Sequence, residues 1–214
     1  MFSLLTSTLI FTNILLLGSS RLAFYVQVVA LQGLLLGSLT LFLHKGALEP
    51  RVVALAISTT VLKGLVFPWL LFRAMREVQV KREVEPLVGY TASLVVGGIL
   101  FGFSMWLSRK LPIQSGVSSK VILPVAFFTM FTGCFLIASR TKAITQVISY
   151  VVIENGIYFF GMSFIGEVPM FIELGILLDI TVGVFIMGIL IHHINREFDS
   201  HDVRRLSALK DSES

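Results

Sequence analysis

The amino-acid sequence predicts an all-α, polytopic integral membrane protein with about seven transmembrane helices. The chain has 214 residues, of which 55% are hydrophobic and only 14% charged, whereas a soluble domain carries about 25% charged residues. Its mean hydropathy is +0.88. Apolar runs of the ~20 residues that cross a bilayer recur along the whole chain. Seven such helices need roughly 140 residues, so we expect one membrane domain over 1–214 and no separate soluble domain.

Each apolar run is expected to be a helix, because backbone groups in lipid must hydrogen-bond internally and none of the runs alternates as a barrel strand does. The first run has no preceding basic residue and no cleavage signal, so we expect a retained helix. The runs are 2–19, 22–43, 52–73, 88–108, 119–139, 144–165 and 170–192. The expected organisation is three helices within 1–75, a spacer helix at 88–108, three helices within 119–195 and a cytoplasmic tail over 196–214.

The basic residues predict the orientation. One set of alternate connections carries 11 Lys and Arg residues and the other carries 5. Cytoplasmic connections are the ones enriched in Lys and Arg, so we expect the N-terminus outside and the C-terminus in the cytoplasm. The sequence pI is about 9.4. Because the basic residues lie in short connections between apolar runs, this charge predicts membrane topology and not a nucleic-acid partner.

Three ionisable residues lie inside the predicted spans, where each costs on the order of 2.5–3.5 kcal/mol on insertion scales. Lys63 lies in the third span, Glu154 in the sixth and Asp179 in the seventh. Residues of this kind usually face protein or water and mark ion or proton routes. The sequence therefore predicts a proton relay with Glu154 and Asp179 as protonatable carriers and Lys63 as a charge that tunes or relays.

Four further residues are candidates for supporting roles. Tyr150 and Tyr158 lie four residues on either side of Glu154, on one helix face, where their hydroxyls can hydrogen-bond the carboxyl. Glu173 lies about one turn inside the outer end of the seventh span, and His193 at its inner end can pass protons to a cytoplasmic entrance. A structural interpretation stays open, in which the acids pair with Lys63 to hold helices together and Glu173 and His193 are solvated interfacial groups.

The sequence contains no pattern for a redox or hydrolytic site. Cys134 is the only cysteine, which excludes an internal disulfide and a CxxC site. We find no Gly-rich phosphate loop, no metal-ligand spacing and no nucleophile–base constellation in a polar segment. We therefore expect no cofactor or metal to be bound by this chain.

Several motifs resemble the hydrogenase-4 membrane component E family. They are the stretch from Gln146 through Tyr150 and Glu154 to Gly156, the run Glu173 to Asp179, the tail Asp202 to Lys210, and the lysine-then-proline pattern Lys63 to Pro68. Residues 119–195 are also similar to the small K subunit of respiratory complex I, a three-helix protein with two mid-membrane glutamates. Asp179 falls where that subunit has its third-helix glutamate. Glu154 lies three residues after Val151, the position of the second-helix glutamate, and on nearly the same face.

The resemblance implies a membrane-arm subunit of a complex I-related hydrogenase or formate hydrogenlyase-type assembly in a prokaryotic inner membrane. The implied partners are antiporter-like membrane subunits, a peripheral iron–sulfur and [NiFe] hydrogenase arm, and membrane lipid. The redox cofactors would belong to those subunits, and this chain would contribute an intramembrane proton or ion pathway coupled to electron transfer. Two alternatives stay open, namely a stand-alone secondary transporter or channel, and a structural spacer subunit without a relay.

Overall fold

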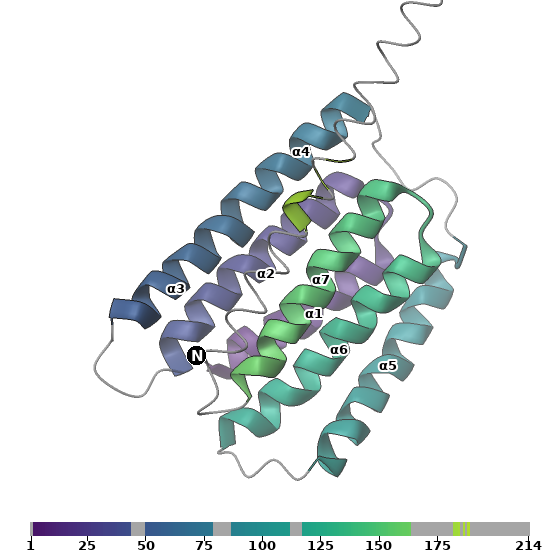
Figure 1. The fold of residues 1–214 in the computed structure, drawn as a ribbon. Helices are drawn as coiled ribbons and strands as arrows, with labels where there is room; N and C mark the ends of the chain where they lie inside the picture. The colour runs from purple at the N-terminus through teal and green to yellow at the C-terminus, as the bar shows by residue number, and fades with distance from the viewer. Residues whose placement is uncertain are drawn as a thin grey trace, which may run out of the picture.

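The computed structural model describes residues 2–43, 50–78, 87–111, 117–163, 182–184, 186 and 188. Within these residues the regular elements are helices, and there is no β-strand, as predicted. They are α1 (Phe2–Gly18), α2 (Leu22–Leu43), α3 (Pro50–Val61), the π-helical segment η1 (Leu62–Val66), α4 (Phe67–Val78), α5 (Tyr90–Lys110), α6 (Val117–Ser139) and α7 (Ala143–Met162). Figure 1 shows them as one bundle, with α3 and α4 forming a continuous rod at one edge and α5 at the opposite edge.

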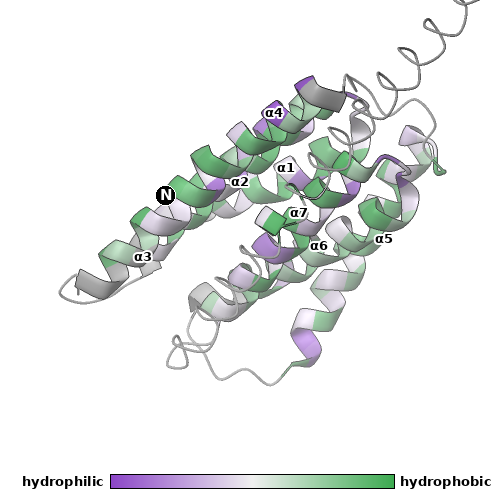
Figure 2. Cartoon of the chain, turned by 45° about the horizontal axis from the view of Figure 1, so that its top comes forward, coloured by the Kyte–Doolittle hydropathy of each residue, from purple (hydrophilic) through white to green (hydrophobic). Residues whose placement is uncertain are grey.

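Five helical stretches of the described residues are long and apolar enough to cross a membrane. They are Leu22–Thr40, Ala56–Arg76, Tyr90–Lys110, Val121–Ser139 and Ala143–Met162. A shorter apolar helix covers Leu4–Gly18. Figure 2 shows that hydrophobic residues predominate along these helices. The predicted run 170–192 and the tail 196–214 lie almost wholly outside the described residues, so the total of seven spans stays a prediction.

The helix directions agree with the predicted grouping of basic residues. The chain runs up and down the bundle, so that the ends of α1, α4 and α6 and the beginnings of α2, α5 and α7 lie at one end (Figure 1). Arg140 links this end of the bundle, since it donates to the carbonyl oxygen of Leu17 at the end of α1. The basic residues of the richer set that the structure describes lie there, namely Arg21, Arg73, Arg76, Arg140 and Lys142. Which face of a membrane this end meets stays the sequence prediction given above.

Two apolar clusters fill the bundle, one toward each end. The first includes Leu17 of α1, Tyr25 of α2, Leu71 of α4 and Ile148 of α7, together with Val182 from the predicted seventh run. The second joins the other halves of the helices and consists of Leu9, Leu36, Leu39, Ile122, Val125, Ala126 and Phe159. The region between the two clusters is where the buried polar side chains lie.

Helices α6 and α7 pack closely because glycines lie at their crossing. A Cβ atom on Gly156 of α7 would lie 2.7 Å from the backbone nitrogen of Met130 and 3.1 Å from the carbonyl oxygen of Ala126. A Cβ atom on Gly133 of α6 would lie 2.8 Å from the backbone nitrogen of Ile153. Small residues of this kind let two helix backbones approach in a membrane. This contact fixes the position of α7, which carries Glu154.

Gly156→Ala is expected to lower the free energy of unfolding by about 1–3 kcal/mol, because the added methyl group meets backbone atoms that cannot move independently. Unfolding in detergent by denaturant or heat measures this change. Gly98→Ala on α5 is the matched control, since a Cβ atom there has no neighbour within 4 Å. Alanine favours a helix over glycine by roughly 0.5–1 kcal/mol, so the control is expected to keep or slightly raise stability. Equal behaviour of the two variants would contradict the close crossing.

A buried arginine fastens three segments at one end of the bundle. Arg140 is 1% exposed. Its Nη1 donates to the carbonyl oxygen of Val88 at 3.1 Å and its Nη2 to that of Leu17 at 3.4 Å. Its Cζ lies 4.8 Å from the centre of the Tyr90 ring. The planar guanidinium binds the two carbonyl oxygens with two different nitrogens held in a fixed arrangement. Lysine has only one side-chain nitrogen and cannot reproduce this arrangement.

Arg140→Lys is therefore expected to destabilise the fold by about 1.5–3 kcal/mol, the scale of a hydrogen bond to a charged group. Arg109→Lys is the matched control, because Arg109 is exposed at the end of α5. The midpoint of thermal unfolding of the two purified variants measures the difference. An unchanged midpoint for Arg140→Lys would contradict the fastening role.

Candidate functional site, a buried polar layer

Lys63 lies on the π-helical segment η1, in the middle of the rod formed by α3 and α4. Its side chain is 1% exposed. The N–H of Phe67 bonds the carbonyl oxygen of Leu62, one residue farther back than in an α-helix. Pro68 comes next and has no backbone N–H, so it cannot donate the hydrogen bond that a regular α-helix would make at this position. The π-helical turn therefore lies directly before a residue that interrupts the helical hydrogen bonds. The Lys63 ammonium donates hydrogen bonds to two residues of α7, Glu154 and Asn155.

Gly33 of α2 allows the backbone of Lys63 to approach α2 directly. A Cβ atom on Gly33 would lie 2.7 Å from the carbonyl carbon of Lys63 and 2.9 Å from its carbonyl oxygen. On the other side of the contact, a Cβ atom on Gly64 would lie 2.7 Å from a methyl group of Leu34. These two glycines set the depth and the distance at which Lys63 enters the bundle.

Lys63 and Glu154 form an ion pair inside the bundle. The Lys63 Nζ contacts Glu154 Oε1 on α7, and each side chain is 1% exposed. The two residues are 91 positions apart in the sequence. Both charges have left water, which costs several kcal/mol for each ion and is offset only by close pairing and further hydrogen bonds. The structure therefore brings together two of the three ionisable residues that the sequence singled out.

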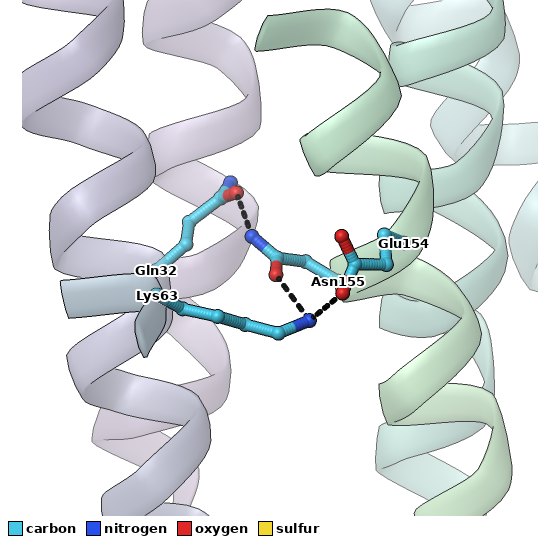
Figure 3. Close-up of polar contacts among 4 residues, drawn as sticks. All are labelled: Gln32, Lys63, Glu154 and Asn155. Atoms are coloured by element: carbon cyan, nitrogen blue, oxygen red, sulfur yellow. Dashed lines mark hydrogen bonds and ion pairs between the residues drawn. The ribbon is translucent and has the colours of Figure 1, made fainter. Parts of the chain in front are cut away.

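Two amide side chains extend this pair toward α2, as Figure 3 shows. The Lys63 Nζ donates to Asn155 Oδ1 at 3.4 Å. The Nδ2 of Asn155 then donates to Gln32 Oε1 at 3.3 Å. Both Asn155 and Gln32 are fully buried. The lysine thus contacts neighbouring residues of α7 and, through one of them, reaches α2.

The polar contacts continue across α1 to α6. Gln32 Nε2 donates to Thr12 Oγ1 at 3.0 Å and to Asn13 Oδ1 at 3.1 Å. Asn13 Nδ2 donates to Thr129 Oγ1 at 2.8 Å. Each residue lies near the middle of its helix and between the two apolar clusters. We call this set the polar layer, and it consists of Thr12, Asn13, Gln32, Lys63, Thr129, Glu154 and Asn155.

Sequence reasoning found the charged members of the polar layer and missed the neutral ones. A buried amide without a partner also costs several kcal/mol in an apolar medium, so Asn13, Gln32 and Asn155 carried a usable signal. All three lie near the middle of apolar runs. Since the middles of spanning helices share one depth, this shared position could have predicted that they meet.

The two tyrosines occupy different surroundings. The Tyr158 ring centre lies 5.6 Å from the Lys63 Nζ, and its hydroxyl lies 3.3 Å from Thr40 Oγ1. The Tyr158 ring therefore lies near the lysine of the pair, and the support of the Glu154 carboxyl by the two tyrosine hydroxyls stays a prediction. Tyr150 is partly buried against the first apolar cluster. A ring face near an ammonium contributes a favourable cation–π interaction.

Asp179, Glu173 and His193 lie outside the described residues, so their predicted roles stay predictions. Among the residues that the structure describes, no group of three or more His, Cys, Asp or Glu side chains is arranged to hold a metal ion.

Comparison with known proteins gives relatives over most of the chain. An uncharacterized protein of Mycobacterium tuberculosis is 29% identical over 206 residues, which cover 95% of this chain and 93% of that protein. Hydrogenase-4 component E of Escherichia coli K12 and its counterpart in Shigella flexneri are 26% identical over 155 residues, which cover 72% of this chain and 71% of each relative. This chain is a distant homologue of Hydrogenase-4 component E. No protein-family model and no solved structure matches it.

The homology agrees with the family resemblance predicted from the motifs at Lys63 and around Glu154. The similarity of residues 119–195 to the K subunit of complex I is not among these matches and stays a prediction. Helices α6 and α7 cover the first two of the three helices concerned.

Proposed function

We propose that this chain is a membrane-arm subunit of a complex I-related hydrogenase or formate hydrogenlyase-type complex, and that it contributes a segment of the intramembrane proton or ion pathway. The homologue is a hydrogenase component, and five stretches of the described chain can cross a membrane. The observation that carries the proposal is the Lys63–Glu154 pair buried midway along two of these stretches. Redox cofactors and the peripheral arm belong to partner subunits.

The strength of the Lys63–Glu154 ion pair depends on whether the Glu154 carboxylate carries a proton. When a proton reaches the Glu154 carboxylate, the carboxyl becomes neutral and its attraction for the Lys63 ammonium falls. When the proton leaves, the attraction returns, and in a low-dielectric interior this difference is large. A proton that binds or leaves Glu154 therefore changes the electrostatic attraction on the Lys63 ammonium of η1, which in turn reaches Gln32 of α2 through Asn155. In the proposal Asp179 is the next carrier, with Glu173 and His193 nearer the two surfaces.

A purely structural role is the second candidate, and the polar layer itself favours it. The same contacts join α1, α2, η1, α6 and α7, which is what an interhelical fastening requires. Hydrogen-bonded polar groups hold helices together inside a membrane by about 0.6–2 kcal/mol each. The two candidates make opposite predictions for a double variant described in the Discussion.

Co-purification in mild detergent tests membership of the complex. The full-length chain with an affinity tag is expected to bring down antiporter-like membrane subunits together with iron–sulfur and [NiFe] hydrogenase-type subunits, identified by mass spectrometry. An unrelated tagged membrane protein from the same cells is the control. Purification as a stable single chain with uptake activity of its own would instead support the stand-alone transporter.

A further inference from the structure

The hydrogen bonds of the polar layer all point the same way, starting from Lys63. The ammonium can only donate, so it fixes the Asn155 side chain with its oxygen toward Lys63 and its NH₂ group toward Gln32. Gln32 must then accept at Oε1 and donate at Nε2 to Thr12 and Asn13. The direction of each bond thus follows from the chemistry of the first donor.

The chain of donors ends on helix backbone. Asn13 donates to Thr129 Oγ1, and the Thr129 hydroxyl donates to the carbonyl oxygen of Val125 at 2.8 Å. On the other branch, the Thr12 hydroxyl donates to the carbonyl oxygen of Leu9 at 2.7 Å. Each side chain therefore presents an acceptor toward Lys63 and a donor away from it. Hydrogen bonds aligned in this way polarise one another.

We infer that Asn155 and Gln32 are positioning residues that keep Lys63 protonated through this aligned chain of hydrogen bonds, so that Glu154 is the member of the ion pair that exchanges protons. The inference rests on the proposed function, in which Glu154 exchanges protons. In an apolar surrounding, an isolated amine–carboxyl pair favours the neutral form, because neither charge is solvated. The aligned amides replace the missing water around the ammonium and stabilise the ionic form.

The amides also confine the exchange. Asn and Gln side chains donate and accept hydrogen bonds without gaining or losing a proton near neutral pH. The polar layer can therefore pass polarisation from Lys63 toward α1 and α6 but cannot carry a proton there. Two titratable side chains of α7, Glu154 and Tyr158, lie against the ammonium. The amides thereby close the route through the polar layer toward α1 and α6 to protons.

Infrared spectroscopy of the purified full-length protein at neutral pH tests the inference, because a carboxylic acid and a carboxylate absorb at different frequencies. The contribution of Glu154 is assigned by its loss in Glu154→Gln. In the wild-type protein Glu154 is expected to be a carboxylate. In Asn155→Leu, which removes the nearest amide, the proton is expected to move from Lys63 to Glu154, so that the carboxylic acid band appears.

Gln32→Met and Thr129→Val interrupt the chain farther from Lys63 and are expected to give the same band with lower intensity. Thr132→Val is the matched control, since Thr132 is equally buried on α6 and lies outside the polar layer. It is expected to leave Glu154 ionised. These milder variants decide the question if Asn155→Leu does not fold.

An unchanged carboxylate in Asn155→Leu, or in Gln32→Met where Asn155→Leu does not fold, would overturn the inference. The same band in Thr132→Val as in Thr129→Val would also overturn it, because the effect would then not follow the chain. The readout is independent of transport. Full transport by Glu154→Gln would defeat the proposed function, while the infrared result decides separately whether the amides hold the charge of Lys63.

Discussion

Glu154→Gln is expected to reduce coupled ion transport by the assembled complex to the background level while the chain still assembles with its partners. Glutamine keeps an oxygen that can accept from the Lys63 ammonium and has nearly the same volume, so the bundle retains its shape. It cannot take up a proton, and a relay that passes through this position stops. Reductant-driven acidification of membrane vesicles, followed with a pH-sensitive dye, measures the transport.

The matched control for this prediction is Ser149→Ala on the same helix. Ser149 is fully buried, and its hydroxyl bonds only within α7 in the described contacts, to the carbonyl oxygen of Thr145 at 2.7 Å. This variant is expected to keep full transport. Full transport by Glu154→Gln, with normal co-purification of the partners, would show that Glu154 is not a proton carrier.

Lys63→Met is expected to lower the free energy of unfolding by about 3–5 kcal/mol, the usual effect of removing one partner from a buried ion pair. Methionine fills much of the same space, so the loss arises mainly from the Glu154 carboxylate, which remains buried without its ammonium. Denaturant unfolding in detergent, followed by helical circular dichroism, measures the change. A shift below about 1 kcal/mol would contradict the idea that the pair is ionic in the folded protein.

The double variant Lys63→Met with Glu154→Leu separates the two candidate functions. Replacing a buried ion pair by apolar residues of similar volume is often neutral or stabilising by ~1–4 kcal/mol, so the double variant is expected to regain most of the lost stability. If the pair only fastens helices together, transport by the complex returns with stability. If the pair is part of the pathway, the double variant is stable and assembled but does not transport, which is the result we expect.

The sequence alone predicted the helices well, because their cause is local. Apolar runs long enough to span a bilayer predicted helices at 22–43, 88–108 and 119–139, and the structure places α2, α5 and α6 over nearly the same residues. The rod formed by α3, η1 and α4 was also predicted as one run at 52–73. Its π-helical turn was not, since it depends on the packing of Lys63 against Gly33 as well as on Pro68.

The sequence predicted only part of the candidate site, because the rest depends on pairing in space. Lys63 and Glu154 stood out since each charge in an apolar run carries a cost that must be offset. Nothing local indicated that these two meet, since 91 positions separate them. The four-residue spacing placed Tyr158 on the helix face of Glu154, but it could not show that the Tyr158 ring also lies near Lys63, because that depends on how α7 packs against the neighbouring helices.

The position of the polar layer between two apolar clusters has an electrical consequence. A charge at the depth of Lys63 and Glu154 is insulated from both aqueous phases by hydrocarbon packing above and below. Any transmembrane voltage must drop across those two insulating zones, and a charge that leaves the layer along the membrane normal crosses part of that voltage. Under the proposed function, a proton exchanged with a neighbouring polypeptide at the same depth would cross none of this voltage.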